Sequence, residues 1–138
     1  MGKKNQPNRS SGLFFVLSGF SGAGKDAVLS RMRDLGYPFH RVTTVTTRPR
    51  RAIELDGIDY YFISETRFQE MVRAGELLEW AQVYENYYGV PKQEIRQALK
   101  DGRNTIVRVD VQGAASIKSL VPEAVLIFLT SGSVQDYE

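Results

Sequence analysis

Short apolar runs mark both ends of the chain. Residues 13–17 and 124–129 form apolar runs with the length of buried strands. A third run, 105–111, contains Arg108 and Asp110, which at a spacing of two lie on one face of a strand and are positioned to pair. Helical stretches separate these runs. The alternation predicts a P-loop NTPase-like α/β fold with a parallel sheet flanked by helices.

Helix-breaking residues set the limits of the helices between these strands. The first helix should end at Gly36 and Pro38, because glycine caps a helix and proline cannot continue it. Pro91 suits the first position of another helix. Helices are therefore predicted over residues 27–34, 91–102 and 112–120.

The middle of the chain, residues 42–99, has a different pattern. Its strands are hairpin-like, because turn signals such as Asp56-Gly57 separate them. A helix begins at Ser64 or Thr66 and stops at Gly75. This segment predicts an inserted mixed α/β subdomain beside the main sheet. Extended pieces are expected over residues 39–45, 58–63, 77–83 and 86–88.

The composition is that of an ordinary globular domain. The chain has 138 residues, of which 42% are hydrophobic and 25% charged, and its formal net charge is +2. So small a charge gives no reason to expect nucleic acid or a membrane surface as a partner. No apolar run is long enough to span a membrane. Residues 1–12 are basic and polar, which predicts a disordered tail before a domain over 13–138.

Two residue types restrict the metal chemistry. The chain has no cysteine, which excludes disulfides and thiolate metal sites and permits a reducing compartment. The lone His40 cannot form a histidine metal site by itself, so we expect it to be a surface or boundary residue.

A glycine-rich turn lies between the first strand and the first helix. Its spacing is G-x-x-x-x-G-K, the spacing of a phosphate loop. Glycine lets the backbone approach an anion closely, and N–H groups of the loop and the first helical turn then point at phosphate oxygens. Lys25 supplies charge for the transferred phosphoryl group, so we expect it to be catalytic. The predicted ATP-binding residues are Gly19, Phe20, Ser21, Gly22, Ala23, Gly24, Lys25 and Asp26.

The loop ends in Asp26, where a phosphate loop usually has Ser or Thr. The usual hydroxyl binds Mg²⁺, and a carboxylate is also a hard oxygen ligand for this ion. We therefore expect a modified phosphate loop in which Asp26 is a Mg²⁺ ligand.

A second set of residues in the middle segment suits a phosphate acceptor. Arg48 and Arg51 lie three apart in a threonine-rich loop, and guanidinium groups bind phosphate bidentately. Tyr60 and Tyr88 bring phenol hydroxyls. The alternative is a solvated basic turn, which we favour only for Arg50. A second phosphate site is predicted here.

Glu79 lies beside Trp80 in an otherwise apolar strand. Guanine presents N1–H and its 2-amino group side by side, and one carboxylate accepts from both. Adenine has no such pair, and a buried carboxylate left unpaired is costly. Glu79 is thus a candidate for reading guanine. A strand-edge glutamate in water is the alternative.

Six ordered motifs resemble the guanylate kinase family. They are Gly19–Lys25, Thr46-Thr47-Arg48 with Arg51, residues 56–62, Glu79-Trp80-Ala81, Asn86-Tyr87-Tyr88-Gly89 and Asp110-Val111-Gln112-Gly113. The resemblance covers residues 13–138. It implies a cytoplasmic enzyme that transfers the γ-phosphoryl group of ATP to GMP with Mg²⁺. It also implies that the GMP-binding residues are Thr44, Arg48, Arg51, Tyr60, Glu79, Tyr88 and Asp110, and that 42–99 is the GMP-binding subdomain.

Some positions depart from the family pattern. Asp26 replaces Ser or Thr, Val90 stands where the family usually has a hydroxyl that contacts the base, and Arg108 stands where it usually has Asp. The family continues into an arginine-bearing lid beyond the last residue here, and a helix that starts near Ser133 stops at Glu138. We expect an incomplete chain that is a poor catalyst by itself.

Two other functions remain open. Ribose bisphosphate kinases resemble this family and share Gly-Lys-Asp and Tyr-Gly-Val with this chain. Against them, Glu79 and the group of Arg48, Arg51 and Tyr60 suit a nucleoside monophosphate better. A non-catalytic guanylate-kinase-like module would bind a protein partner in the acceptor cleft. Such modules typically lose the phosphate-loop lysine, and Lys25 is retained.

Overall fold

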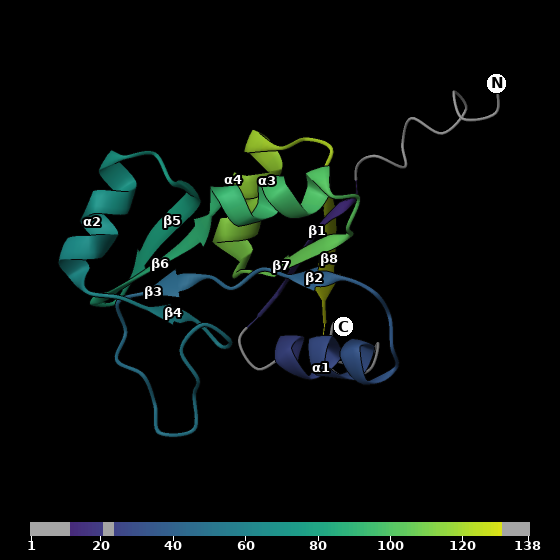
Figure 1. The fold of residues 1–138 in the computed structure, drawn as a ribbon, viewed down its shortest axis with the longest axis horizontal. Helices are drawn as coiled ribbons and strands as arrows, with labels where there is room; N and C mark the ends of the chain where they lie inside the picture. Colours follow the sequence, from purple (N-terminus) through teal and green to yellow (C-terminus); the bar gives the residue numbers. More distant parts are fainter. Residues whose placement is uncertain (1–11, 21–23, 131–138) are drawn as a thin grey trace, which may run out of the picture.

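The computed structural model describes residues 12–20 and 24–130 (Figure 1). The disordered tail predicted over residues 1–12 lies outside them except for Gly12. The helix start predicted near Ser133 lies outside them altogether.

A four-stranded parallel sheet forms the main body, as the sequence predicts. Its strand order is β2-β7-β1-β8, and all three pairings are parallel. This arrangement confirms the α/β class. The strands are β1 (Phe14–Gly19), β2 (His40–Arg41), β7 (Thr105–Arg108) and β8 (Val125–Leu129).

Helices cover both faces of this sheet (Figure 1). On one face α1 (Lys25–Asp34) packs Leu29 against Leu17 and Ile106. On the other face lie α3 (Lys92–Lys100) and α4 (Val111–Leu120). None of the helices in the described part of the chain is long and apolar enough to cross a membrane.

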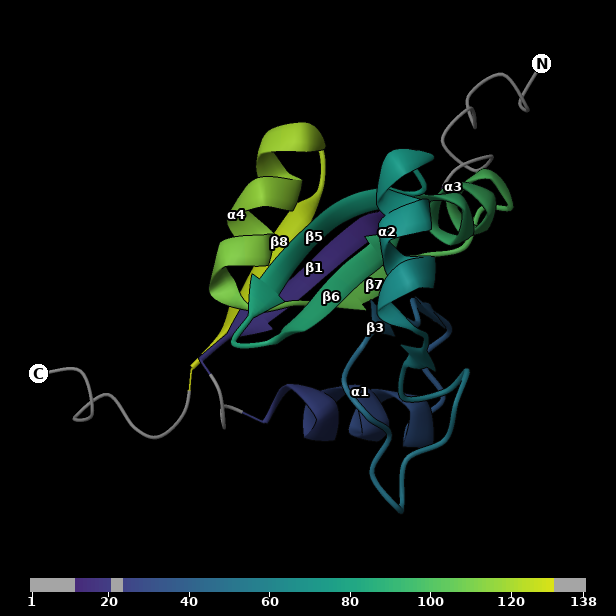
Figure 2. The same cartoon turned by 90° about the vertical axis from the view of Figure 1, so that its left-hand side faces the viewer.

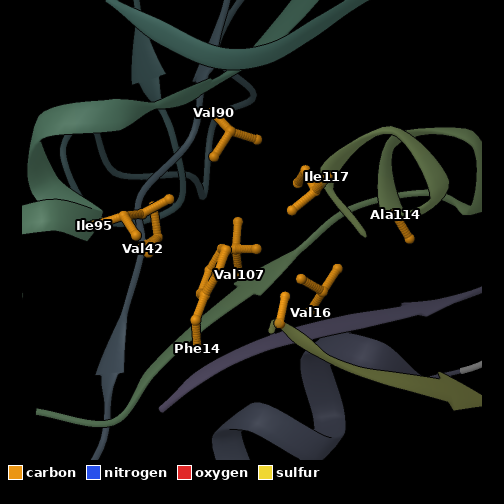
Figure 3. Close-up of a cluster of buried hydrophobic side chains, with 9 residues drawn as sticks. Phe14, Val16, Val42, Val90, Ile95, Val107, Ala114 and Ile117 are labelled. Atoms are coloured by element: carbon orange, nitrogen blue, oxygen red, sulfur yellow. The ribbon is translucent and has the colours of Figure 1, made fainter. Parts of the chain in front are cut away.

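The larger core cluster lies on the α3 and α4 face (Figure 3). Val16 and Val107 of the sheet are fully buried there, together with Ile117 of α4. Val90 of the second sheet joins the same cluster. The second sheet is thereby fixed to the parallel sheet by apolar packing.

The second sheet is mixed and has the order β4-β3-β6-β5. Its strands are β3 (Val45–Thr46), β4 (Tyr61–Phe62), β5 (Leu77–Val83) and β6 (Asn86–Pro91). Figure 2 shows α2 (Glu65–Arg73) against this sheet and α1 well apart from it. The side chain of Ser64 accepts from the Arg67 N–H and so caps α2. The limits 42 and 99 of an inserted subdomain stay a prediction.

The extended piece expected over 39–45 divides into β2 and β3, which belong to different sheets. Two further strands are shorter than predicted because aspartates use the backbone groups beyond them. The strand expected over 58–63 is reduced to β4, since the Asp59 carboxylate accepts from the Leu55 N–H and holds a loop. The strand expected over 105–111 ends at Arg108. Asp110 instead caps α4 by accepting from the Gly113 N–H at 2.7 Å.

The prediction of a buried strand over 124–129 is wrong in one respect. The strand forms as β8, but Val125, Leu126, Ile127 and Phe128 are each between 39% and 44% exposed. The reason is its position at the edge of the parallel sheet. It pairs with β1, and no other strand of the described residues lies on its outer side.

Candidate nucleotide site

A cavity of about 340 Å³ lies between the two sheets, at the carboxyl ends of β1 and β7. Ligands of open α/β sheets bind at this end of the strands. Five of the seven predicted GMP-binding residues line the cavity, namely Thr44, Tyr60, Glu79, Tyr88 and Asp110. Of the predicted ATP-binding residues, Gly19 and Lys25 line it. Arg108, which the sequence did not place in a site, lines it as well.

The phosphate-loop side of the cavity begins at Gly19, where β1 ends, and Gly24 leads into α1. Gly24 precedes α1 with φ of 90°, a left-handed backbone that side chains rarely adopt. The Lys25 Nζ donates to the Gly19 carbonyl at 2.8 Å. The predicted ATP-binding residues Ser21, Gly22 and Ala23 lie outside the described residues. Phe20 is exposed and meets Phe128 edge-on.

The pKa of Lys25 lies below its ordinary value. Burial lowers its pKa, and the neighbouring positive charge of Arg108 lowers it further. Asp110 and Asp26 oppose this effect in part. The ammonium group is thus placed beside another cation inside a cavity, which is a setting that attracts an anion.

Asp26 is held by two arginines. Its Oδ1 lies 3.1 Å from the Arg41 Nη2 and 3.0 Å from the Arg108 Nε. Arg108 therefore pairs with Asp26 and not with Asp110, which instead caps α4. The sequence missed this contact because residues 26, 41 and 108 come from three separate elements.

These contacts do not fit Asp26 as a direct Mg²⁺ ligand. Coordination through Oδ1 would bring the ion next to two guanidinium groups that already occupy this oxygen. Within residues 12–20 and 24–130, no group of three or more His, Asp or Glu side chains is arranged to hold a metal ion. The metal role of Asp26 stays a prediction that its observed partners disfavour.

At the acceptor side, Glu79 and Asp110 face the first turn of α4. A β-carbon added at Gly113 would lie 3.1 Å from the Glu79 Oε1 and 3.1 Å from the Asp110 Oδ1. An irregular register in β5 between Leu77 and Glu79 changes the direction of the strand at this point. Burial raises the pKa of Glu79, and the charge of Asp110 raises it further.

Arg48 is fixed within its own loop. Its two terminal nitrogens donate to the Glu54 carboxylate at 3.1 and 2.8 Å, and Oε1 of Glu54 also accepts from the Arg51 N–H. This pairing lowers the pKa of Glu54 to about 2 and raises that of Arg48. Sequence reasoning missed Glu54, because no spacing rule relates residues in an irregular loop.

The predicted GMP-phosphate residues come together only in part. The Arg48 guanidinium stands 5.3 Å from the centre of the Tyr60 ring, but neither Arg48 nor Arg51 lines the cavity. Arg51 is exposed. The rings of Tyr60 and Tyr88 lie 6.1 Å apart, and the Tyr60 hydroxyl accepts from the Arg108 Nη2 at 2.9 Å.

Val90 gives the cavity an apolar wall. Its side chain is 2% exposed, and it belongs to the core cluster as well as to the cavity lining. A base in this cavity would meet a hydrocarbon surface here, since valine has no hydrogen-bonding group.

The fold and site define a P-loop nucleotide-binding protein. A parallel sheet carries a glycine-rich loop after an inner strand, and a cavity joins this loop to a second sheet. Residues 12–138 match the family model described as "Guanylate kinase". The chain belongs to the guanylate kinase family.

Individual relatives agree with the family match. The chain is 40% identical over 125 residues to the guanylate kinase of Clostridioides difficile (strain 630), which covers 91% of this chain and 61% of that protein. It is 44% identical over 122 residues to guanylate kinase 2, chloroplastic/mitochondrial, of Oryza sativa subsp. japonica. That match covers 88% of this chain and 43% of the rice protein. The crystal structure of guanylate kinase from Anaplasma phagocytophilum superposes with a TM-score of 0.71 at 31% identity, covering 86% and 60%. The chain thus spans about 60% or less of the length of these relatives.

Proposed function

We propose that the protein is a kinase that transfers the γ-phosphoryl group of ATP to GMP, giving ADP and GDP. The observation that carries this proposal is that Lys25 of the phosphate loop and Glu79 of the second sheet line one cavity. A donor phosphate beside Lys25 and a guanine beside Glu79 would then share a single cavity. Phosphoryl transfer depends mainly on such positioning and on charge around the transferred group.

Each side of the cavity has a distinct task in this proposal. Thr44, Tyr60 and Tyr88 would hold the GMP phosphate with Arg48 and Arg51, and their hydroxyls would donate to its oxygens. Glu79 would accept from guanine N1–H and the 2-amino group as an ionised carboxylate. Its raised pKa means that guanine must stabilise the charge that burial disfavours. The role that we assign to Asp110 is to hold the turn beside Glu79 through its cap of α4.

Lys25 would donate to oxygens between the β- and γ-phosphates of ATP. Its Nζ, which donates to the Gly19 carbonyl at 2.8 Å, would turn to these oxygens. ATP would be used together with Mg²⁺, which would supply positive charge to offset that of the phosphates. The proposal gives no protein ligand of this ion among the described residues. We also propose that the enzyme is located in the cytoplasm.

One observation favours a second candidate acceptor, ribose bisphosphate. The buried Val90 offers no hydrogen bond to a base, and a sugar phosphate needs none. The buried position of Glu79 argues the other way, because a carboxylate without a partner in the cavity is costly.

The test is a coupled assay of ADP formation by the natural full-length protein, with GMP, AMP or ribose bisphosphate as acceptor. We expect turnover with GMP at least about 10²-fold above turnover with AMP, because adenine leaves Glu79 unpaired. Preferred use of ribose bisphosphate would support the second candidate. Absence of turnover with all three acceptors would favour a non-catalytic module that binds a protein partner.

A further inference from the structure

The two arginines that hold Asp26 have different surroundings. Arg41, on β2, faces a separate hollow lined by Leu29 and Phe39. Arg108, at the end of β7, lines the cavity that contains Lys25 and Tyr60. Of these two cations on one carboxylate oxygen, only Arg108 reaches the place where two nucleotides would meet.

Arg108 also connects the two sides of that cavity. Its Nε pairs with Asp26 in the first turn of α1, and its Nη2 donates to the Tyr60 hydroxyl at 2.9 Å. The ring of Tyr60 lies 5.7 Å from the Arg108 guanidinium and 5.3 Å from that of Arg48. Arg108 therefore links the first turn of α1 to Tyr60, whose ring also lies against Arg48.

The ion pair of Arg108 is with an exposed and shared carboxylate. Burial works against its charged form, but Tyr60 and Asp26 outweigh this effect and raise the pKa of Arg108. Asp26 is 64% exposed and divides one oxygen between two arginines, whereas Arg108 is 22% exposed. An ion pair with so exposed a partner is weak. A phosphate, with more charge and more acceptor oxygens, would compete with it easily.

We infer that Arg108 is a catalytic residue that binds the phosphoryl group during its transfer between the two nucleotides. This inference rests on the proposed function. An oxygen of the GMP phosphate forms the new bond to phosphorus while the bond to the β-phosphate oxygen of ATP breaks, so the products are GDP and ADP. Charge spreads over the three equatorial oxygens of the transferred group. Arg108 exchanges Asp26 for these oxygens and donates to them from a rigid strand.

Two departures from the family pattern meet in this arrangement. The sequence has a carboxylate at residue 26 and a guanidinium at residue 108, and the structure places these groups 3.0 Å apart. Asp26 thus holds Arg108 in the cavity until a phosphate arrives. In this way the main sheet itself supplies a phosphate-binding cation.

The first experiment compares Arg108→Lys and Arg108→Ala with Arg41→Lys and Arg41→Ala in the natural full-length protein. Arg41 is the matched control, because it holds the same oxygen of Asp26 from outside the cavity. Arg108→Lys should lower kcat by about 10²-fold with less than about a fivefold change in KM, since loss of one transition-state donor costs 10²- to 10³-fold. Arg41→Lys should stay within about threefold of wild type. Equal losses in the two lysine variants would overturn the inference and leave Arg108 as a structural partner of Asp26.

Chemical rescue separates contact with the phosphoryl group from a structural role. Millimolar guanidinium chloride should raise the activity of Arg108→Ala at least about tenfold. Sodium chloride of equal ionic strength should not raise it. If Arg108→Ala does not fold, Arg108→Lys carries the test, because lysine keeps the charge but loses the planar fork. Rescue of Arg41→Ala to the same extent would count against the inference.

A binding measurement distinguishes this inference from the proposed function. Inorganic tripolyphosphate, titrated calorimetrically, should bind about tenfold more weakly to Arg108→Ala than to Arg41→Ala, whatever the acceptor is. If wild type forms no GDP and this difference is found, the proposed function fails but Arg108 still binds phosphate. If wild type forms GDP and the two variants match in kcat and in tripolyphosphate affinity, the inference about Arg108 fails alone.

Discussion

Two arginines are each held against a carboxylate, one on the donor side of the cavity and one in the neighbouring acceptor loop. On the acceptor side, Arg48 and Glu54 are 12% and 16% exposed and share two hydrogen bonds within one loop. On the donor side, Arg108 shares a single oxygen of the exposed Asp26 with Arg41. A shielded bidentate pair fixes geometry, whereas an exposed shared pair is weak. The comparison indicates that the acceptor loop is preorganised and that the donor-side cation is ready to exchange its partner.

The largest effect is expected from a substitution that removes a donor-side group and leaves the acceptor side intact. Lys25→Ala should lower kcat by roughly 10³-fold, because it removes a charged donor at the transferred phosphate. The midpoint of thermal unfolding should stay within about 2 °C of wild type, since the Lys25 side chain donates to the Gly19 carbonyl and belongs to none of the core clusters of the described residues. Kinetics and calorimetry check both parts. The control is Lys100→Ala, at the exposed end of α3, and near-normal turnover of Lys25→Ala would refute the phosphate-loop role.

A smaller effect should separate the acceptor side from the donor side. Glu79→Gln should raise KM for GMP by about 10- to 100-fold, because hydrogen bonds to a charged group are worth about 1.5–3 kcal/mol. KM for ATP should change less than about threefold. Stability should not fall, because burial and Asp110 raise the pKa of Glu79 and its charge therefore opposes folding.

Steady-state kinetics with each nucleotide varied in turn checks this prediction. Glu76→Gln is the matched control, since Glu76 is exposed just before β5. Equal changes in the two KM values of Glu79→Gln would argue against a role in reading guanine.

How far the sequence anticipated these features depends on how local they are. Gly19, Gly24 and Lys25 lie within seven residues, so local spacing alone predicted that a strand ends and a helix begins here, as β1 and α1 do. The limits of β5 were also predicted from local patterns, and Ser64 was one of two residues predicted to cap α2. These features depend on backbone periodicity and on side chains close in sequence.

The remaining features depend on contacts between distant segments. Asp26 and Arg108 are 82 positions apart, and nothing in either local pattern indicates their pairing. The exposure of β8 likewise follows from its edge position, whereas its apolar composition predicted burial. No single run of residues determines the order of the strands in a sheet.

The smallest expected effect concerns the fixed pair on the acceptor side. The pKa of Glu54 falls from 4.5 to about 2 on folding, so its charge stabilises the protein above pH 4.5 and this stabilisation is lost as pH falls toward 2. Glu54→Gln should lower stability at pH 7 and flatten its dependence on pH between about 4.5 and 2. Urea unfolding at several pH values measures this, with the exposed Glu85→Gln as control. A pH dependence unchanged from wild type would show that the Arg48–Glu54 pair does not stabilise the fold.

The central claim is that donor and acceptor groups act within one cavity. The most direct measurement is calorimetric binding of a bisubstrate compound in which a phosphate chain joins adenosine to guanosine, using wild type, Lys25→Ala, Glu79→Gln and the double variant. We predict one bound molecule per chain, with affinity reduced at least about tenfold by each single change and by more in the double variant. Binding that is insensitive to either Lys25→Ala or Glu79→Gln would contradict the claim that this cavity joins the two nucleotides.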